Sequence, residues 1–483
     1  MSPATRRSRS SPVSRPEITL RHDNAAGSPG IASSTVTLQL AGDRKSTGAR
    51  RGAGWRHSPA GRAARLAGRE WLLVLASLST VFAAVIAAIS SQPAERAWGL
   101  FATAGYGVAS LILLITRRWP AGRTAPRRAT GLAVLAALAG AVLAPLGWLA
   151  VTGGAQPEVG VTVRSAALLL HRGTPYQGAA ALAAAHSPYA YTPYLPALIG
   201  FGLPRAVFGG GPLTDPRLWF GVVFGISFGA ALALLGTRHS GWWTAVVIAS
   251  PVIAFPLSVG GDDLPVLGLI CLGFALLAEP RGRSWPRLAA AGVVLGVAAA
   301  MKATAWPALV VVLLLVGTRQ GKRAAGLVAL AALAVAGLAD GPVAAMDPAA
   351  MVVNTLAFPL GLAKIASPAA SLLPGHLIAS AGRAGHWAAI GLVALAALTA
   401  GAWLVARPPA SARAAAWRLA IGLTALFLLA PATRAGYFMY PLGLAIFALL
   451  AAKTQVSAAL RQPPGRAQPI RDPQLASVTT SMR

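Results

Sequence analysis

The chain has 483 residues, of which 55% are hydrophobic and only 11% are charged. Soluble domains average roughly 25% charged residues, so this composition excludes an ordinary soluble protein. Apolar runs of about 20 residues recur along the chain, which is typical of transmembrane helices. Alternating short runs, the pattern of an outer-membrane barrel, are absent. The predicted fold class is therefore all-α, a polytopic transmembrane helical bundle.

The formal net charge of +29 could indicate a nucleic-acid partner. However, the basic residues concentrate in the N-terminal tail and in short connectors between apolar runs, as the positive-inside rule describes. Basic and aromatic residues do not interleave as in nucleic-acid-binding domains, so membrane lipids and not nucleic acids are the expected partners. The one cysteine, Cys271, lies in an apolar run, which excludes an intramolecular disulfide and cysteine-based metal spacings.

The two ends of the chain differ from its middle. Residues 1–69 are rich in Ser, Arg, Pro and Gly and lack helical periodicity, so we expect a disordered, basic cytoplasmic tail. No apolar core follows closely enough for this segment to be a signal peptide. A transmembrane domain is expected over residues 70–453, and a second disordered cytoplasmic tail over residues 454–483.

About twelve spans are expected, within a range of 10–13, although one or two could be re-entrant. In chain order they are 71–90, 98–116, 129–152, 220–236, 242–258, 264–278, 288–303, 306–318, 324–339, 387–406, 419–432 and 437–452. Alternate connectors hold most of the loop Arg and Lys residues, which predicts a multi-pass protein of the cytoplasmic membrane with both termini in the cytoplasm. Residues 193–208 are apolar enough to dip into the membrane.

The connectors predicted to lie outside carry a distinctive set of polar residues. The two longest are 153–219, expected to contain loop helices, and 340–386. Six of the seven tyrosines fall on this side, as do seven of the thirteen acids, which are Glu95, Glu158, Asp215, Asp262, Asp263, Asp340 and Asp347. Tyrosine rings pack on the apolar faces of pyranoses, and carboxylates accept hydrogen bonds from hydroxyls. Clustered together, they are a plausible lining for a sugar site.

Four segments, taken in order, resemble glycosyltransferase family 87. They are 158–176 (EVGVTVRSAALLLHRGTPY), 189–196 (YAYTPYLP), 261–265 (GDDLP) and 300–307 (AMKATAWP). Members of this family are polyprenyl-phosphate-mannose-dependent mannosyltransferases of the GT-C superfamily, and the resemblance covers roughly residues 129–452. The usual acid at the start of the long loop is aspartate. Glu158 keeps the carboxylate but moves it by one methylene.

The resemblance implies an integral membrane glycosyltransferase that moves a hexose, mannose in the family, from a polyprenyl-phosphate donor to a hydroxyl of a lipid or glycan acceptor outside the cytoplasm. Glu158 is the candidate catalytic base. Lys302 and Arg434 are the candidate ligands of the donor phosphate. Each has a plainer interpretation: Glu158 as a helix-start acid, Lys302 as a snorkelling lysine and Arg434 as an interface anchor.

A further set of residues is expected to contact the sugar or the acceptor. It comprises Asp262, Asp263, Tyr176, Tyr189, Tyr191, Tyr194, His376 and Tyr437. His376 could instead be a satisfied loop histidine. Asp262 and Asp263 could hold a divalent cation, although two carboxylates alone make a weak metal site. No other cofactor is expected.

Other functions are compatible with many spans. A transporter or lipid flippase is the main alternative, and a non-catalytic scaffold is a third. A transporter needs a polar path that reaches both sides of the membrane, whereas this chain concentrates acids and tyrosines on one side. The transferase interpretation makes a sharper spatial prediction, namely that Glu158 and Lys302 line one shared cavity.

Overall fold

The computed structural model describes residues 59–118, 124–278 and 284–459, and the predicted all-α bundle is confirmed there. Most of the two expected tails lies outside the described residues. Their inner ends differ from expectation, because α2 (Pro59–Ile89) begins before residue 69 and α21 (Met439–Ala459) continues past residue 453.

Within the described residues, nine helices are long and apolar enough to cross a membrane. They lie in α2, α3 (Pro93–Ile115), the continuous pair α4 (Thr124–Leu138) and α5 (Ala144–Thr152), α10 (Pro216–Leu234), α15 (Trp306–Gln320), α16 (Lys322–Met346), α19 (Arg383–Ala406), α20 (Ala412–Leu429) and α21. The pair α11 (Ser240–Ile248) and α12 (Pro251–Val259) is apolar enough only when taken together, and it is bent by 65°, the geometry of a broken span or a re-entrant loop.

Every expected span is helical, but two are too short to cross a membrane alone. Helices α13 (Leu264–Leu276) and α14 (Trp285–Ala299) have 13 and 15 residues. At about 1.5 Å per residue they extend about 20 Å, less than the roughly 30 Å of a hydrocarbon core. A buried polar turn lies at one end of each helix: residues 260–263 precede α13 and residues 300–302 follow α14. Hydropathy alone assigns these turns to the spans or to their edges.

The bend between α11 and α12 is held by the N-terminal helices. The hydroxyl of Tyr106 on α3 donates to the backbone carbonyl of Ala249 at the bend (2.7 Å). A π-helical turn, Ala139–Leu143, joins α4 to α5. Such turns alter the helical hydrogen-bond ladder, and here the carbonyl of Ala141 accepts from the indole of Trp98 (2.9 Å). Side-chain bonds to backbone carbonyls therefore join α3 both to the α11–α12 bend and to the π-helical turn.

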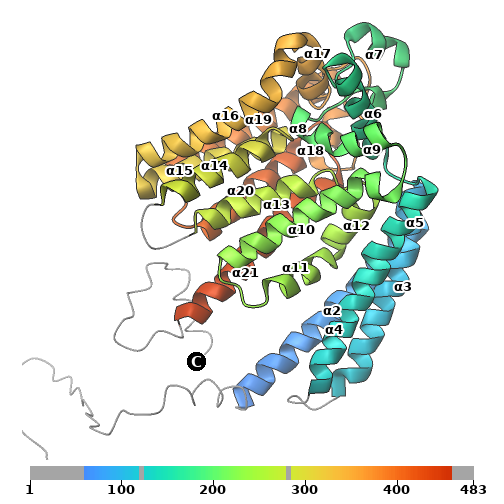
Figure 1. Cartoon of the computed structure of the whole chain (residues 1–483), viewed down its shortest axis with the longest axis vertical. Helices are drawn as coiled ribbons and strands as arrows, with labels where there is room; N and C mark the ends of the chain where they lie inside the picture. Colours follow the sequence, from blue (N-terminus) through green and yellow to red (C-terminus); the bar gives the residue numbers. More distant parts are fainter. Residues whose placement is uncertain (1–58, 119–123, 279–283, 460–483) are drawn as a thin grey trace, which may run out of the picture. The chain divides into compact units, whose positions relative to one another are not determined.

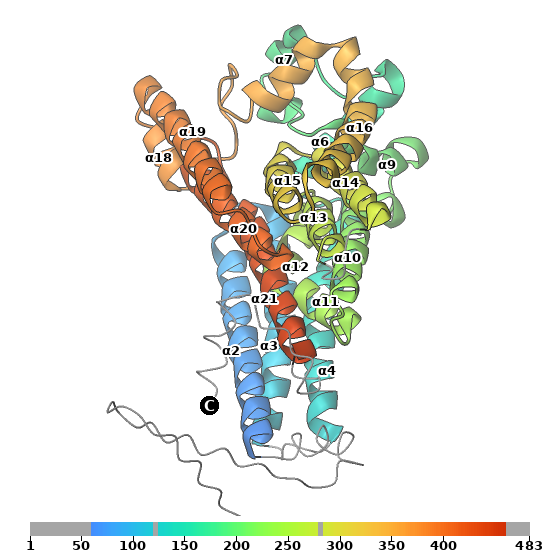
Figure 2. The ribbon, with the colours of Figure 1, turned by 90° about the vertical axis from the view of Figure 1, so that its left-hand side faces the viewer.

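Short helices gather at one end of the membrane helices, as Figures 1 and 2 both show for α6, α7 and α17. They are α6 (Pro157–Arg172), α7 (Ala179–Ala185), α8 (Pro196–Ile199), α9 (Leu203–Phe208), α17 (Pro348–Val352) and α18 (Pro374–Ala379). Helix α6 follows from local sequence: Pro157 suits the first helical position, and Gly173 ends the helix in the left-handed conformation (φ 72°). The expected loop helices are thus present.

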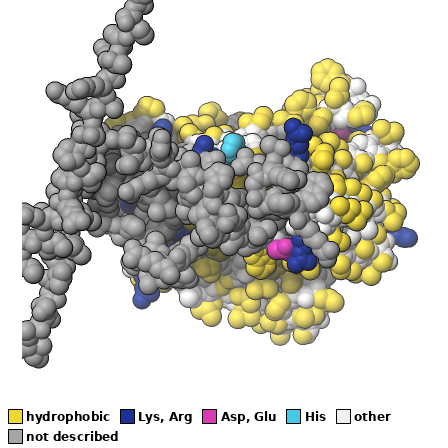
Figure 3. Space-filling model, turned by 90° about the horizontal axis from the view of Figure 1, so that it is seen from below, with side chains coloured by type: hydrophobic (Ala, Val, Ile, Leu, Met, Phe, Trp, Pro, Cys, Tyr) yellow, Lys and Arg dark blue, Asp and Glu magenta, His cyan; other side chains and the backbone are white. Residues whose placement is uncertain are grey.

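The surface agrees with a membrane environment. Hydrophobic side chains cover most of the face visible in Figure 3 outside the residues drawn in grey, and acidic side chains are few there. Large apolar residues are strongly exposed along the spans, for example Leu338 (80%) and Leu398 (72%). A face of this kind would be unstable in water and is favourable against lipid.

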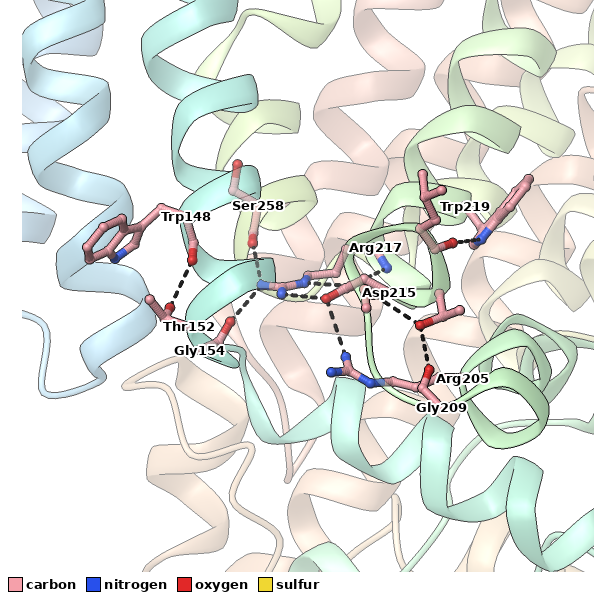
Figure 4. A network of polar contacts seen from close by, with 12 residues as sticks. Trp148, Thr152, Gly154, Arg205, Gly209, Asp215, Arg217, Trp219 and Ser258 are labelled. Carbon is pink, nitrogen blue, oxygen red and sulfur yellow. Dashed lines mark hydrogen bonds and ion pairs between the residues drawn. The ribbon is translucent and has the colours of Figure 1, made fainter.

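A buried ion pair joins three segments next to the loop helices (Figure 4). Asp215 precedes α10 and accepts two hydrogen bonds from the Arg217 guanidinium (2.9 and 2.7 Å) and one from its backbone N–H (3.0 Å). The guanidinium also donates to the carbonyls of Gly154 and Ser258, both at 2.9 Å. Both side chains are almost fully buried. This network fixes the start of α10 against the ends of α5 and α12.

Candidate active site

One cavity of about 920 Å³ brings together the connectors that the sequence predicts to lie outside. Five of these connectors contribute to its wall, through residues such as Glu95, Glu158, Asp262, Ser367 and Arg434, and Lys302, which lies beside the sixth, also lines it. Glu158 and Lys302 therefore line the same cavity, as predicted. The common location of these connectors agrees with the predicted alternation of the spans.

Backbone hydrogen bonds between distant segments assemble this cavity. The N–H of Gln156, just before α6, donates to the carbonyl of Val259 at the end of α12 (2.7 Å), which brings Glu158 towards the 260–263 turn. The N–H of Leu195 donates to the carbonyl of Met301 (3.0 Å), which places the tyrosine-rich stretch beside Lys302. These bonds depend on the tertiary fold and have no local sequence signature.

The 366–371 segment positions Arg434 in a similar way. The N–H of Thr433 donates to the carbonyl of Ala369 (2.8 Å), and the N–H of Ser371 donates to the carbonyl of Thr433 (3.0 Å). The Ser371 hydroxyl accepts from the N–H of Ala435 (3.0 Å). Three bonds around one residue hold the backbone of Arg434 and direct its side chain to the cavity wall.

Lys302 lies between two aspartates. Its ammonium is 2.9 Å from Asp262 Oδ2 and 2.6 Å from Asp263 Oδ1, and all three residues are less than 10% exposed. The ammonium also lies 5.0 Å from the ring centroid of Tyr194. Burial acts to lower the pKa of Lys302, but the two carboxylates raise it above its ordinary value. Lys302 is therefore a cation, and the snorkelling interpretation does not describe it.

This arrangement does not fit a divalent cation at Asp262 and Asp263. The Lys302 ammonium occupies the position between the two carboxylates that such a cation would need. Among the residues that the structure describes, no cluster of three or more His, Cys, Asp or Glu side chains could complete a metal site.

Glu158 lies in the first turn of α6 and pairs with Arg434, with 2.5 Å between Oε1 and the guanidinium. Its other oxygen, Oε2, is buried and accepts no hydrogen bond from any residue that the structure describes. Burial raises the pKa of Glu158 above its ordinary value, and the nearby charge of Arg434 only partly offsets this. Glu158 thus combines a helix-start position with one unsatisfied carboxylate oxygen and raised basicity.

The cavity contains more acid than base. Four carboxylates and two cations line it, and both cations already contact carboxylates. Arg434 keeps more capacity for a further anion than Lys302, because it has five N–H donors and is 23% exposed at its side chain, against 9% for Lys302. Of the two predicted phosphate ligands, Arg434 is the more accessible.

Four of the predicted aromatic contacts line the cavity: Tyr189, Tyr191, Tyr194 and Tyr437. Tyr191 also stacks on Phe358, with ring centroids 4.4 Å apart. The backbone next to them is held by Arg164 on α6, whose guanidinium donates to the carbonyls of Tyr189 and Ala190.

Two predicted contacts do not reach the cavity wall. The hydroxyl of Tyr176 donates to the carbonyl of Tyr194 (2.9 Å), and its ring is buried against α16 and α17. A ring nitrogen of His376 lies 3.1 Å from the carbonyl of Pro431. Both side chains lie against backbone carbonyls, and neither lines this cavity. Their place in the loops was visible in the sequence, but their direction was not.

Three polar residues of the site were missed as site residues. Glu95 lines the cavity and accepts from the amide of Gln156 (2.8 Å) and from the hydroxyl of Ser90 (2.7 Å). Tyr440 donates to Asp263 Oδ1 (2.9 Å) and accepts from Thr304 (3.1 Å). Glu95 was recognisable only as one of the few outer acids, and Gln156 only by its closeness to Glu158.

The sequence comparisons bear on this geometry. A sequence model of the family described as Glycosyltransferase family 87 matches residues 189–431, which include Asp262, Asp263 and Lys302 and stop short of Glu158 and Arg434. No curated protein matches the chain significantly. The match covers half of the chain and favours a transferase over a transporter or flippase. The chain belongs to glycosyltransferase family 87, and with its many spans it is a multi-pass membrane glycosyltransferase.

Proposed function

We propose that this enzyme transfers a hexose, mannose first among the candidates, from a polyprenyl-phosphate donor to a hydroxyl of a lipid or glycan acceptor. The observation that carries the proposal is one cavity that holds an unsatisfied carboxylate oxygen of Glu158 together with the cations Lys302 and Arg434. The positive-inside pattern supports a location in the cytoplasmic membrane, with this cavity on the outer side and both termini in the cytoplasm.

The other wall of the cavity supports a lipid-linked donor. Apolar side chains from α2, α12 and α21 line it, among them Phe82, Ile86, Val252, Phe255 and Leu442. An isoprenoid chain removes apolar surface from water when it packs against such a wall. A nucleotide sugar would leave this wall uncovered. The cavity therefore has a polar end for sugar and phosphate and an apolar end for a lipid tail.

The proposed reaction is a direct displacement with inversion. The acceptor hydroxyl gives its proton to Oε2 of Glu158 while its oxygen forms the new bond to the anomeric carbon. The bond between that carbon and the phosphate oxygen breaks, and the polyprenyl phosphate leaves with the electron pair. Arg434 faces the phosphate with the donors that Glu158 does not use, and Lys302 adds a fixed positive charge. Asp262 and Asp263 accept hydrogen bonds from sugar hydroxyls.

The test uses the purified full-length protein in lipid nanodiscs. A radiolabelled short-chain polyprenyl-phosphate mannose is the donor, and an alkyl mannoside is the acceptor; the corresponding glucose donor and GDP-mannose run in parallel. We expect transfer from the polyprenyl donor, and loss of transfer in Glu158→Gln. Glu70→Gln is the matched control, because the described contact of Glu70 is an exposed ion pair with Arg117.

Three results would contradict the proposal. Transfer from GDP-mannose alone would exclude the lipid-linked donor. Full transfer by Glu158→Gln would exclude the base. Retention of configuration at the anomeric carbon, read by NMR of the product, would exclude direct displacement.

A further inference from the structure

A second hollow lies away from the proposed active site. It is a groove of about 550 Å³ between α15, α16, α19 and α20, and it shares no lining residue with the first cavity. Its wall is almost entirely apolar, with Leu309, Leu333 and Leu423 among the lining residues. Figure 2 shows α19 diverging from α15 and α16 towards its Arg383 end. The groove is thus open along helices that would face lipid.

One charged side chain lines this groove. Arg418 lies inside α20, within a segment apolar enough to span the membrane. Its guanidinium carbon lies 5.1 Å from the ring centroid of Trp403, which also lines the groove. Its Nη1 is buried and has no hydrogen-bond partner within the described part of the chain. Among the described residues, no carboxylate forms an ion pair with it.

An uncompensated cation inside a span is costly and usually marks a binding function. The missing partner must be an anion that can enter an apolar groove. A lipid phosphate meets both conditions, since guanidinium binds phosphate oxygens well and the acyl chains can cover the leucines.

The position of Arg418 indicates which lipid this is. Arg418 lies eleven residues before the cavity-side end of α20 at Leu429, a distance of about 16 Å along the helix axis. Arg407 lies in the turn at the opposite end and Arg413 in the first turn of α20, so three arginines lie near this mouth of the groove. A polyprenyl-phosphate donor would have its phosphate near Arg434 instead. Anionic phospholipids concentrate where membrane proteins carry such basic turns.

We infer that this groove is a binding site for an anionic phospholipid, with its phosphate on Arg418 and an acyl chain along α15 and α19. The lipid fills the space between α19 and the rest of the bundle. This site is independent of the proposed transfer reaction.

The test is native mass spectrometry of the full-length protein after exchange into nanodiscs of equal parts phosphatidylglycerol and phosphatidylcholine. We expect phosphatidylglycerol to be retained selectively. Arg418→Gln should weaken this retention about tenfold or more, the effect of losing one charge-assisted contact. Arg407→Gln, with the same loss of charge at an exposed position, should change it less than about twofold.

A second pair of variants keeps every charge. Gly422 lines the groove, and a Cβ placed there would meet open space. Gly422→Leu should fill the groove and expel the lipid without a clash. Gly391→Leu on α19 is the control, because Gly391 is equally open but does not line the groove.

The inference is overturned if phosphatidylglycerol and phosphatidylcholine are retained equally, or if Arg407→Gln and Arg418→Gln weaken retention equally. It is also overturned if added polyprenyl phosphate displaces phosphatidylglycerol stoichiometrically, since the groove would then be part of the donor site. Transfer assays on Gly422→Leu separate this result from the proposed function, because loss of lipid with full transfer leaves the reaction proposal intact.

Discussion

Two carboxylate–arginine pairs in this protein have the same chemistry, but they differ in how many hydrogen bonds the carboxylate accepts and in the direction of its pKa shift. Asp215 and Arg217 are almost fully buried, and Arg217 saturates the carboxylate with two side-chain bonds and one backbone bond. Burial acts to raise the pKa of Asp215, yet the bonds and charge of Arg217 hold it below its ordinary value. Glu158 has a single close contact with Arg434, and burial raises its pKa.

The difference separates structure from function. A saturated buried pair is a joint between helices, because every polar atom already has a partner and none remains for a ligand. A half-satisfied pair in a cavity wall leaves lone pairs and donors that a substrate can use. Four experiments test this contrast.

The largest effect is expected from Glu158→Gln. It should lower kcat for sugar transfer by about 10²- to 10⁴-fold, the usual contribution of a general base, with little loss of thermal stability. Glu158→Asp should keep more activity than the glutamine variant, since it keeps a carboxylate at this position. Equal activity of the two variants would argue for a purely structural carboxylate.

Arg217→Met should lower thermal stability and leave kcat for sugar transfer nearly unchanged. Removing one partner of a buried pair costs about 3–5 kcal/mol of stability, because the Asp215 carboxylate loses its two close guanidinium bonds and keeps only the longer contact with Arg205 (3.6 Å) among its described ion pairs. The measurement is the midpoint of thermal unfolding in nanodiscs. The double variant Asp215→Asn with Arg217→Met should recover part of the loss. Transfer per folded molecule should stay near wild type, and a selective loss of kcat would contradict the contrast.

Transfer activity and stability should be lost at different pH values, because the pKa of Glu158 is raised and that of Asp215 is lowered. Glu158 must be ionised to act as the base, so transfer should fall as pH drops through its raised pKa. Asp215 has a depressed folded-state pKa, so its stabilising effect is complete above the unfolded value of about 3.9 and disappears as pH falls through the lower folded value. Activity should therefore be lost at a higher pH than stability. Coincident loss of both would contradict this.

The smallest effect is expected from Tyr440→Phe. It removes the hydroxyl that donates to Asp263, a net contribution of about 1 kcal/mol, or about fivefold in kcat/KM. Tyr106→Phe is the matched control, because its hydroxyl bonds a backbone carbonyl at the α11–α12 bend. An equal effect of both variants would place Tyr440 among the structural residues.

Several features followed from the sequence alone because they depend on local chemistry. Apolar runs predicted the membrane helices, since burying a backbone in lipid demands helical hydrogen bonding. Pro157 and Gly173 bracket α6 because of their own backbone preferences. The choice of Lys302 also rested on a local argument, namely that a charge beside an apolar run needs a partner.

Only the tertiary structure decided which outer residues meet. Tyr176 and Tyr194 look alike in sequence, but one supports a backbone carbonyl while the other lines the cavity beside Lys302. Hydropathy could not show that α13 and α14 are too short to cross a membrane. The turns at their ends are buried because Asp263 and Lys302 pair with each other in place of water, and these two residues lie 39 positions apart in the sequence. Side-chain direction and ion-pair partners depend on contacts between distant segments. Composition and periodicity report only on neighbours along the chain.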